Sequence, residues 1–131
     1  MEIGIEWDGG TGYQVTTASG AGMTLDSAAT AGPSPMETLL AALAGCMAID
    51  IVLILQRMRA APERVAGRVA GVRREEHPRR FERITLEFTG AGEGVTARRL
   101  DRAVKLSFEK YCSVLHSLNR DTAFDWTARA G

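Results

Sequence analysis

Residues 33–53, PSPMETLLAALAGCMAIDIVL, contain most of the longest apolar run in the chain, and the rest of the fold is expected to form around them. Ser34 stands three residues before Glu37, the pattern of a capping box that starts a helix. We expect this helix to continue to about Arg59, with Pro62 beyond it as the stop. Residues at three- and four-residue steps along it form one stripe: Leu39, Leu43, Cys46, Asp50, Leu53 and Arg57.

The apolar run Leu39–Leu55 raises the question of a membrane span. It has seventeen residues, fewer than the ~20 that a span needs. Asp50 lies inside the run and would cost about 2.5–3.5 kcal/mol at the centre of a bilayer. A helix that is apolar on nearly all sides is typical of the buried centre of a soluble protein. The sequence therefore predicts a buried central helix and no membrane partner.

Short segments that alternate apolar and polar residues flank this helix on both sides. Residues 2–7 and 12–19 predict a hairpin around the turn DGGTG, and residues 21–27 add a third strand. After the helix the sequence predicts strands at 63–76 and 79–90, helices at 92–111 and 112–119, and an edge strand at 122–128. The first of these two helices is predicted to have one inner face, formed by Leu100, Ala103, Val104, Ser107, Phe108 and Tyr111. The order βββ-α-ββ-α-α-β predicts an α+β fold with antiparallel sheets around the long helix.

Length and composition place the chain among single-domain soluble proteins. Its 131 residues are 45% hydrophobic and 24% charged, which fits one domain over residues 1–131. Sixteen basic residues balance sixteen acidic ones, so the chain has no net positive charge that would attract nucleic acid. The acidic N-terminus MEIGIEWDGG lacks the basic start of a signal peptide, which predicts a cytoplasmic protein. In that reducing compartment, two cysteines are expected as free thiols or as a working redox pair.

Three other patterns carry little functional information. TGAGEGVT, residues 89–96, has Val95 where a dinucleotide-binding loop requires glycine, so we interpret it as a connecting loop. The segment RREEHPRRFER alternates in charge and is typical of a solvated hairpin tip. His77 and His116 stand alone, without the spacing of a zinc site. We therefore predict no metal and no cofactor.

Local sequence distinguishes the two cysteines. Cys46 lies three turns into its helix, and Asp50 follows one turn later on the same face. The negative charge of Asp50 disfavours a thiolate at Cys46, so the local sequence indicates an inert buried thiol. Cys112 lies at or near a helix start, where backbone N–H groups favour a thiolate, and His116 follows four residues later. The alternative for either cysteine is a structural role as a small apolar residue in the core.

Two segments together carry a family resemblance. GPSPMETLLAALAGCMAIDIVL and KYCSVLHSLN, whose cysteines are 66 residues apart, resemble the two cysteine motifs of the OsmC/Ohr superfamily, the osmotically inducible and organic hydroperoxide resistance proteins. The resemblance implies an intertwined homodimer with the long helix at its centre and an active site at the subunit interface. It also implies that Cys46 is the peroxidatic cysteine and Cys112 the resolving cysteine, with a dithiol as reductant.

The sequence departs from the peroxidase pattern at the groups that activate the thiol. Met36 stands where the N-P-E motif of the peroxidases has its glutamate, and no arginine precedes Arg57. Glu37 is one residue further on, and we expect it to cap the helix. This pattern is more similar to the OsmC-like branch of the superfamily.

Two functions follow from the resemblance. The leading hypothesis is a thiol-dependent peroxidase that reduces organic hydroperoxides through Cys46 and Cys112, with Glu37, Asp50 and His116 as possible supporting residues. The alternative is a non-enzymatic OsmC-like protein that binds a small apolar ligand. The retained cysteine pair favours the enzyme, and the missing arginine and glutamate favour the binding protein.

Overall fold

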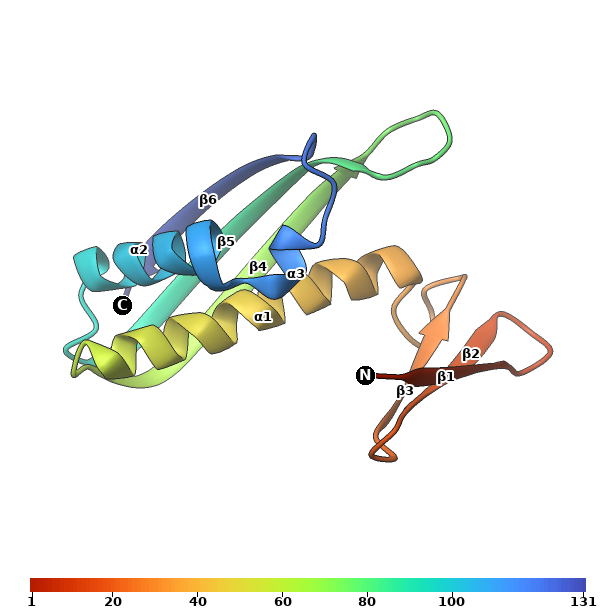
Figure 1. The fold of residues 1–131 in the computed structure, drawn as a ribbon, viewed down its shortest axis with the longest axis horizontal. Helices are drawn as coiled ribbons and strands as arrows, with labels where there is room; N and C mark the ends of the chain where they lie inside the picture. Colours follow the sequence, from red (N-terminus) through yellow and green to blue (C-terminus); the bar gives the residue numbers. More distant parts are fainter. The chain divides into compact units, whose positions relative to one another are not determined.

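The computed structural model describes residues 1–131 and divides them into two compact units, Met1–Leu39 and Leu40–Gly131. Figure 1 shows the elements of both units, and each unit is described by itself below. The observed order of strands and helices is the predicted one, with a short π-helical turn, η1, inserted after the second helix.

The N-terminal unit is a three-stranded antiparallel sheet in the order β1-β2-β3. Its strands are β1 (Ile3–Trp7), β2 (Gly12–Thr17) and β3 (Gly22–Asp26), which confirms the predicted hairpin and third strand. Asp26 ends β3 and accepts hydrogen bonds from the backbone N–H groups of Ala28 and Ala31. These bonds, that from Ala31 first, hold the pKa of Asp26 well below its usual range and order the loop before the long helix.

The long helix α1 spans Pro35–Arg57. The capping box forms as predicted, because the Ser34 N–H donates to the Glu37 carboxylate at 2.8 Å and the Glu37 N–H donates to the Ser34 hydroxyl at 3.3 Å. The helix ends two residues earlier than expected, since Arg59 adopts a left-handed conformation with φ 60°. The chain then enters the next strand directly.

The C-terminal unit contains a second sheet in the order β4-β5-β6. β4 (Ala61–Arg73) and β5 (Phe81–Glu93) pair antiparallel, and β6 (Ala123–Ala130) pairs with β5 in parallel. The expectation of purely antiparallel sheets is therefore wrong for this one pair. The reason is topological: the helices between β5 and β6 return the chain to the start of β5, as a parallel connection requires.

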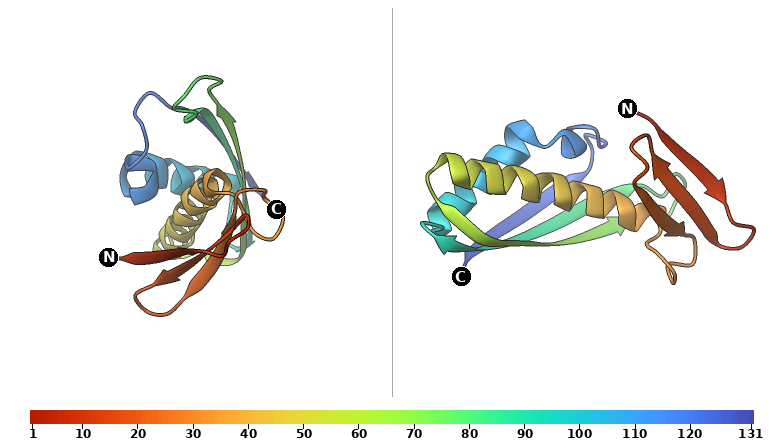
Figure 2. Two further views of the ribbon diagram at one scale, coloured as in Figure 1. Left: turned by 90° about the vertical axis from the view of Figure 1, so that its right-hand side faces the viewer. Right: turned by 90° about the horizontal axis from the view of Figure 1, so that it is seen from below.

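Two helices and the sheet enclose the core of this unit. α1 from Leu40 onward and α2 (Ala97–Leu106) lie on the same face of β4-β5-β6 (Figure 2). The fully buried apolar side chains come from both helices and from the central strand: Leu43, Met47, Ile51 and Leu55 of α1, Ile84, Leu86 and Phe88 of β5, and Leu100, Ala103 and Val104 of α2.

α1 is long and apolar enough, by length and composition, to cross a membrane, with a mean hydropathy of 2.4 over its most apolar window. A core helix of a soluble protein passes the same test. Its buried stripe is formed by Leu43, Met47, Ile51 and Ile54, while Ile49 and Leu53 are 64% and 47% exposed. One face of α1 is therefore core and the opposite face is open.

Candidate functional site

Cys46 and Asp50 lie one turn apart on α1, at the edge of its buried face. Both are half-buried, whereas their neighbours Met47 and Ile51 are fully buried. Of the stripe predicted from the sequence, Leu43 is fully buried, while Cys46 and Asp50 lie at the boundary of the core. Because α1 is apolar on nearly every side, periodicity alone did not identify the face that packs on the sheet.

The π-helical turn η1 (Ser107–Tyr111) places Cys112 opposite Cys46. The Cys112 N–H donates to the Ser107 carbonyl at 2.8 Å, a bond that spans five residues instead of four. Such a turn inserts one extra residue and shifts the side chains that follow it around the axis. Tyr111, predicted to face the core, is 42% exposed, and Cys112 is fully buried in its place.

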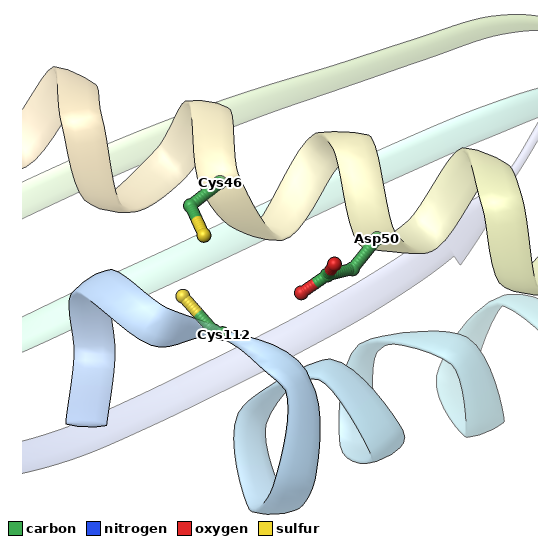
Figure 3. A group of neighbouring side chains, drawn as sticks. All are labelled: Cys46, Asp50 and Cys112. Carbon is green, nitrogen blue, oxygen red and sulfur yellow. The ribbon is translucent and has the colours of Figure 1, made fainter. Parts of the chain in front are cut away.

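The three side chains converge in one compact cluster. The sulfurs of Cys46 and Cys112 and a carboxylate oxygen of Asp50 all lie within 4.8 Å of one another. Figure 3 shows the two thiols pointing toward each other from α1 and from the segment before α3 (Ser113–His116), with the Asp50 carboxylate beside them. Both cysteines are free thiols in this structure. They are close enough for rotation of their side chains to bring the sulfurs together.

A buried hydroxyl fixes the carboxylate. Ser107 is fully buried, and its Oγ donates to Oδ2 of Asp50 at 2.8 Å. The Ser107 carbonyl also accepts the hydrogen bond from the Cys112 N–H, so Ser107 of η1 is hydrogen-bonded to both Asp50 and Cys112. From the sequence, Ser107 is predicted only to lie on the inner face of a helix. A hydroxyl among apolar residues on that face was the signal that could have indicated a buried polar partner.

The environment of Cys112 keeps its thiol protonated. Burial is the main cause that raises the pKa of Cys112 to about 12, and the neighbouring Cys46 and Asp50 add to it. Cys112 does cap α3, and its sulfur accepts a hydrogen bond from the Leu115 N–H at 3.4 Å. The expectation that this helix start favours a thiolate is nevertheless wrong. α3 has only four residues, and the burial of the thiol outweighs its single N–H donor.

No basic side chain is bonded to the cluster. None of the ion pairs or side-chain hydrogen bonds of Cys46, Asp50 or Cys112 involves an arginine, lysine or histidine. His116 instead lies with Nε2 3.1 Å from the Phe108 carbonyl oxygen. Glu37, in the N-terminal unit, is engaged by Ser34, and these bonds lower its pKa. Of the possible supporting residues, Asp50 is the one that the structure brings to both cysteines.

The chain belongs to the OsmC-like protein family, whose profile matches residues 26–127. It is 39% identical to the protein YhfA of Escherichia coli K12 over 121 residues, which cover 92% of this chain and 90% of that protein. The resemblance predicted from the two cysteine motifs is thereby confirmed.

Solved structures agree with this assignment. A hypothetical protein from Aquifex aeolicus VF5 is 31% identical, with a TM-score of 0.89 over 99% of this chain and 95% of that chain. An OsmC-like protein of unknown function from Vibrio cholerae is 15% identical, with a TM-score of 0.82 over 97% of each chain. The organic hydroperoxide resistance protein OhrB of Bacillus subtilis is 15% identical, with a TM-score of 0.61 over 99% of this chain and 96% of OhrB. At that identity OhrB shares the fold alone with this chain.

Proposed function

We propose that this protein is a thiol-dependent peroxidase that reduces organic hydroperoxides through Cys46 and Cys112. The observation that carries the proposal is the pairing of a half-buried thiol with a fully buried one within 4.8 Å. A two-cysteine mechanism needs one sulfur that substrate can reach and a second that is close enough to form a disulfide. Cys46 supplies the first and Cys112 the second.

The first step oxidises Cys46. Its thiolate attacks the terminal oxygen of the hydroperoxide, so that an S–O bond forms, the O–O bond breaks and the alkoxide leaves. Asp50 accepts the proton of the Cys46 thiol and returns it to the alkoxide, which departs as the alcohol. Cys46 is left as a sulfenic acid, two electrons more oxidised. Cys112 is unsuited to this step because its pKa of about 12 keeps it protonated.

The second step forms the disulfide. The sulfur of Cys112 attacks the sulfur of Cys46, the S–O bond breaks, and the hydroxide leaves as water with the Cys112 proton. An external dithiol then reduces the disulfide by thiol exchange and becomes a disulfide itself. Burial of Cys112 restricts its chemistry to the one sulfur that it faces.

Apolar surface left open in each unit supports a homodimer as the working form. On β1, Ile3, Ile5 and Trp7 lie on one side of the strand and are 63%, 62% and 60% exposed. On α1, Ile49 and Leu53 are open as well. A soluble protein buries such contiguous apolar surface, and a second copy of the chain offers the matching one. We place this dimer in the cytoplasm.

A specific feature favours the alternative, a ligand-binding protein. A cavity of about 620 Å³ lies between α1 and α2, with Ile54, Met58 and Leu106 on its wall. Four arginines also line it: Arg57, Arg98, Arg99 and Arg102. Such a cavity suits a ligand with an anionic group more than the small apolar ligand inferred from the sequence.

Trapping of the intermediate tests the proposal. In Cys112→Ser, one equivalent of cumene hydroperoxide should convert Cys46 to a sulfenic acid that a dimedone adduct identifies by mass. Cys46→Ser should give no adduct and no alcohol. Ser113→Ala, an exposed change next to Cys112, should behave as the wild type. If hydroperoxide leaves the thiols of the wild type unchanged while the folded protein binds an anionic ligand, the binding function replaces the enzyme.

A further inference from the structure

We propose that the reduced protein binds a divalent metal ion of the zinc class through Cys46, Asp50 and Cys112. The proposal stands on ligand geometry and does not depend on peroxidase activity. Two sulfurs and a carboxylate oxygen within 4.8 Å of one another are a donor set for such an ion. Zinc sites take thiolate sulfur at about 2.3 Å and carboxylate oxygen at about 2.0–2.2 Å from the metal. Modest rotation of the three side chains closes the cluster to that size.

The spacing of these ligands explains why sequence motifs missed them. Cys46 and Asp50 are one helical turn apart, and Cys112 comes from a segment more than sixty residues further along the chain. The absence of paired histidines led to the prediction of no metal. The π-helical turn η1 brings Cys112 to the other two ligands. No local pattern of cysteines or histidines in the sequence indicates this third ligand.

The charge of the cluster favours a cation. With both thiols ionised, the three side chains carry three negative charges, and no basic side chain is bonded to any of them. A divalent ion supplies the missing positive charge and ionises Cys112 despite its burial. Two thiolates with one carboxylate favour zinc over magnesium or calcium, which prefer oxygen ligands alone.

Outer contacts support two of the three ligands, Asp50 and Cys112. The Ser107 hydroxyl donates to Asp50 and directs the carboxylate toward the sulfurs, as the second layer of a metal site does. The Leu115 N–H donates to the sulfur of Cys112, which stabilises it as a thiolate. Three protein ligands leave one tetrahedral position for water or an exogenous ligand. Formation of the Cys46–Cys112 disulfide removes two of the ligands, so metal binding and oxidation exclude each other.

Cobalt(II) substitution tests the site without peroxide or turnover. Reduced protein titrated anaerobically with Co²⁺ should develop thiolate-to-cobalt charge-transfer absorption and the visible bands of tetrahedral cobalt, at one ion per chain. Zn²⁺ should displace the cobalt, and Zn²⁺ added to the metal-free reduced protein should release close to two protons at neutral pH, one from each thiol. Cys46→Ser and Cys112→Ser should abolish the charge-transfer pattern of two thiolates.

The remaining variants separate a built site from adventitious binding. Asp50→Ala should lower zinc affinity at least tenfold, and Ser107→Ala should lower it about 10- to 100-fold while the cobalt spectrum keeps its thiolate bands. His116→Ala, which removes a ring that lies 3.1 Å from the Phe108 carbonyl oxygen and makes no hydrogen bond to the cluster, should bind as the wild type. Circular dichroism of each variant checks that it is folded.

A cobalt spectrum without thiolate bands, or one that Cys112→Ser leaves unchanged, overturns the metal proposal. Neither result bears on the peroxidase, because hydroperoxide is absent from the titration.

Discussion

The hydrogen bond between Ser107 and Asp50 should couple the two residues energetically. The Ser107 hydroxyl is fully buried and lies 2.8 Å from Oδ2 of Asp50. Hydrogen bonds to charged groups contribute about 1.5–3 kcal/mol, and Asp50 is only half-buried, so we expect the lower end of that range. Ser107→Ala should therefore lower the free energy of unfolding by about 1.5–2 kcal/mol.

A double-mutant cycle isolates this bond from the loss of packing. The free energy of unfolding is measured by urea denaturation for wild type, Ser107→Ala, Asp50→Ala and the double variant, at one protein concentration. We expect a coupling energy of about 1 kcal/mol or more. Ser117→Ala is the matched control, since Ser117 is exposed and its hydroxyl donates to a backbone carbonyl. The control should cost no more than about 0.5 kcal/mol.

A coupling energy near zero would contradict a fixed hydrogen bond between Ser107 and Asp50. It would mean that the Asp50 carboxylate finds an equally good partner in water when Ser107 is changed. Asp50 would then lack a fixed orientation, and both its role as proton acceptor and its role as metal ligand would lose their structural basis.

Four further outcomes are expected. Glu37→Gln should cost at most about 1 kcal/mol of stability and leave peroxide reduction unchanged, because Gln also closes the capping box; a large loss of turnover in folded protein would make Glu37 catalytic. Because the pKa of Asp26 is lowered in the folded protein, its ionised carboxylate stabilises the loop at pH values above the unfolded-state pKa of about 3.9, and this stability should be lost as the pH falls below that pKa. Trp7 fluorescence in a Trp126→Phe background should show the acid transition, and Asp26→Asn should weaken the transition. Sedimentation velocity should find a dimer at micromolar concentration, and Ile49→Glu should dissociate it; a folded wild-type monomer would contradict the assembly. Asp50→Asn should slow the formation of the sulfenic acid in Cys112→Ser about 100-fold, measured by stopped flow, and an unchanged rate would remove Asp50 from the mechanism.

Local signals in the sequence predicted most of the fold. The capping box at Ser34 and Glu37 located the start of α1, and turn residues separated strands with clear alternation. The parallel pairing of β6 was missed, because an edge strand has the same alternation whichever way it runs.

The pairing of the two cysteines was predicted, but the residues around them were not. Cys46 and Cys112 were paired by resemblance, and the structure places their sulfurs in one cluster. The π-helical turn that buries Cys112 has no sequence signature, so its raised pKa was not foreseen. Ser107 was overlooked because its partner Asp50 is 57 residues away. Polar contacts between distant segments depend on packing that periodicity does not describe.

The stoichiometry of a single turnover is the decisive measurement for the proposed reaction of Cys46 and Cys112 with a hydroperoxide. Reduced protein is mixed anaerobically with one equivalent of cumene hydroperoxide per chain, without any external thiol. The alcohol product, the free thiols and the disulfide-linked peptides are then counted. For a two-cysteine peroxidase we expect one alcohol formed and two thiols lost per chain, with the peptides of Cys46 and Cys112 joined to each other. Intact thiols and unconsumed hydroperoxide would contradict the proposed reaction.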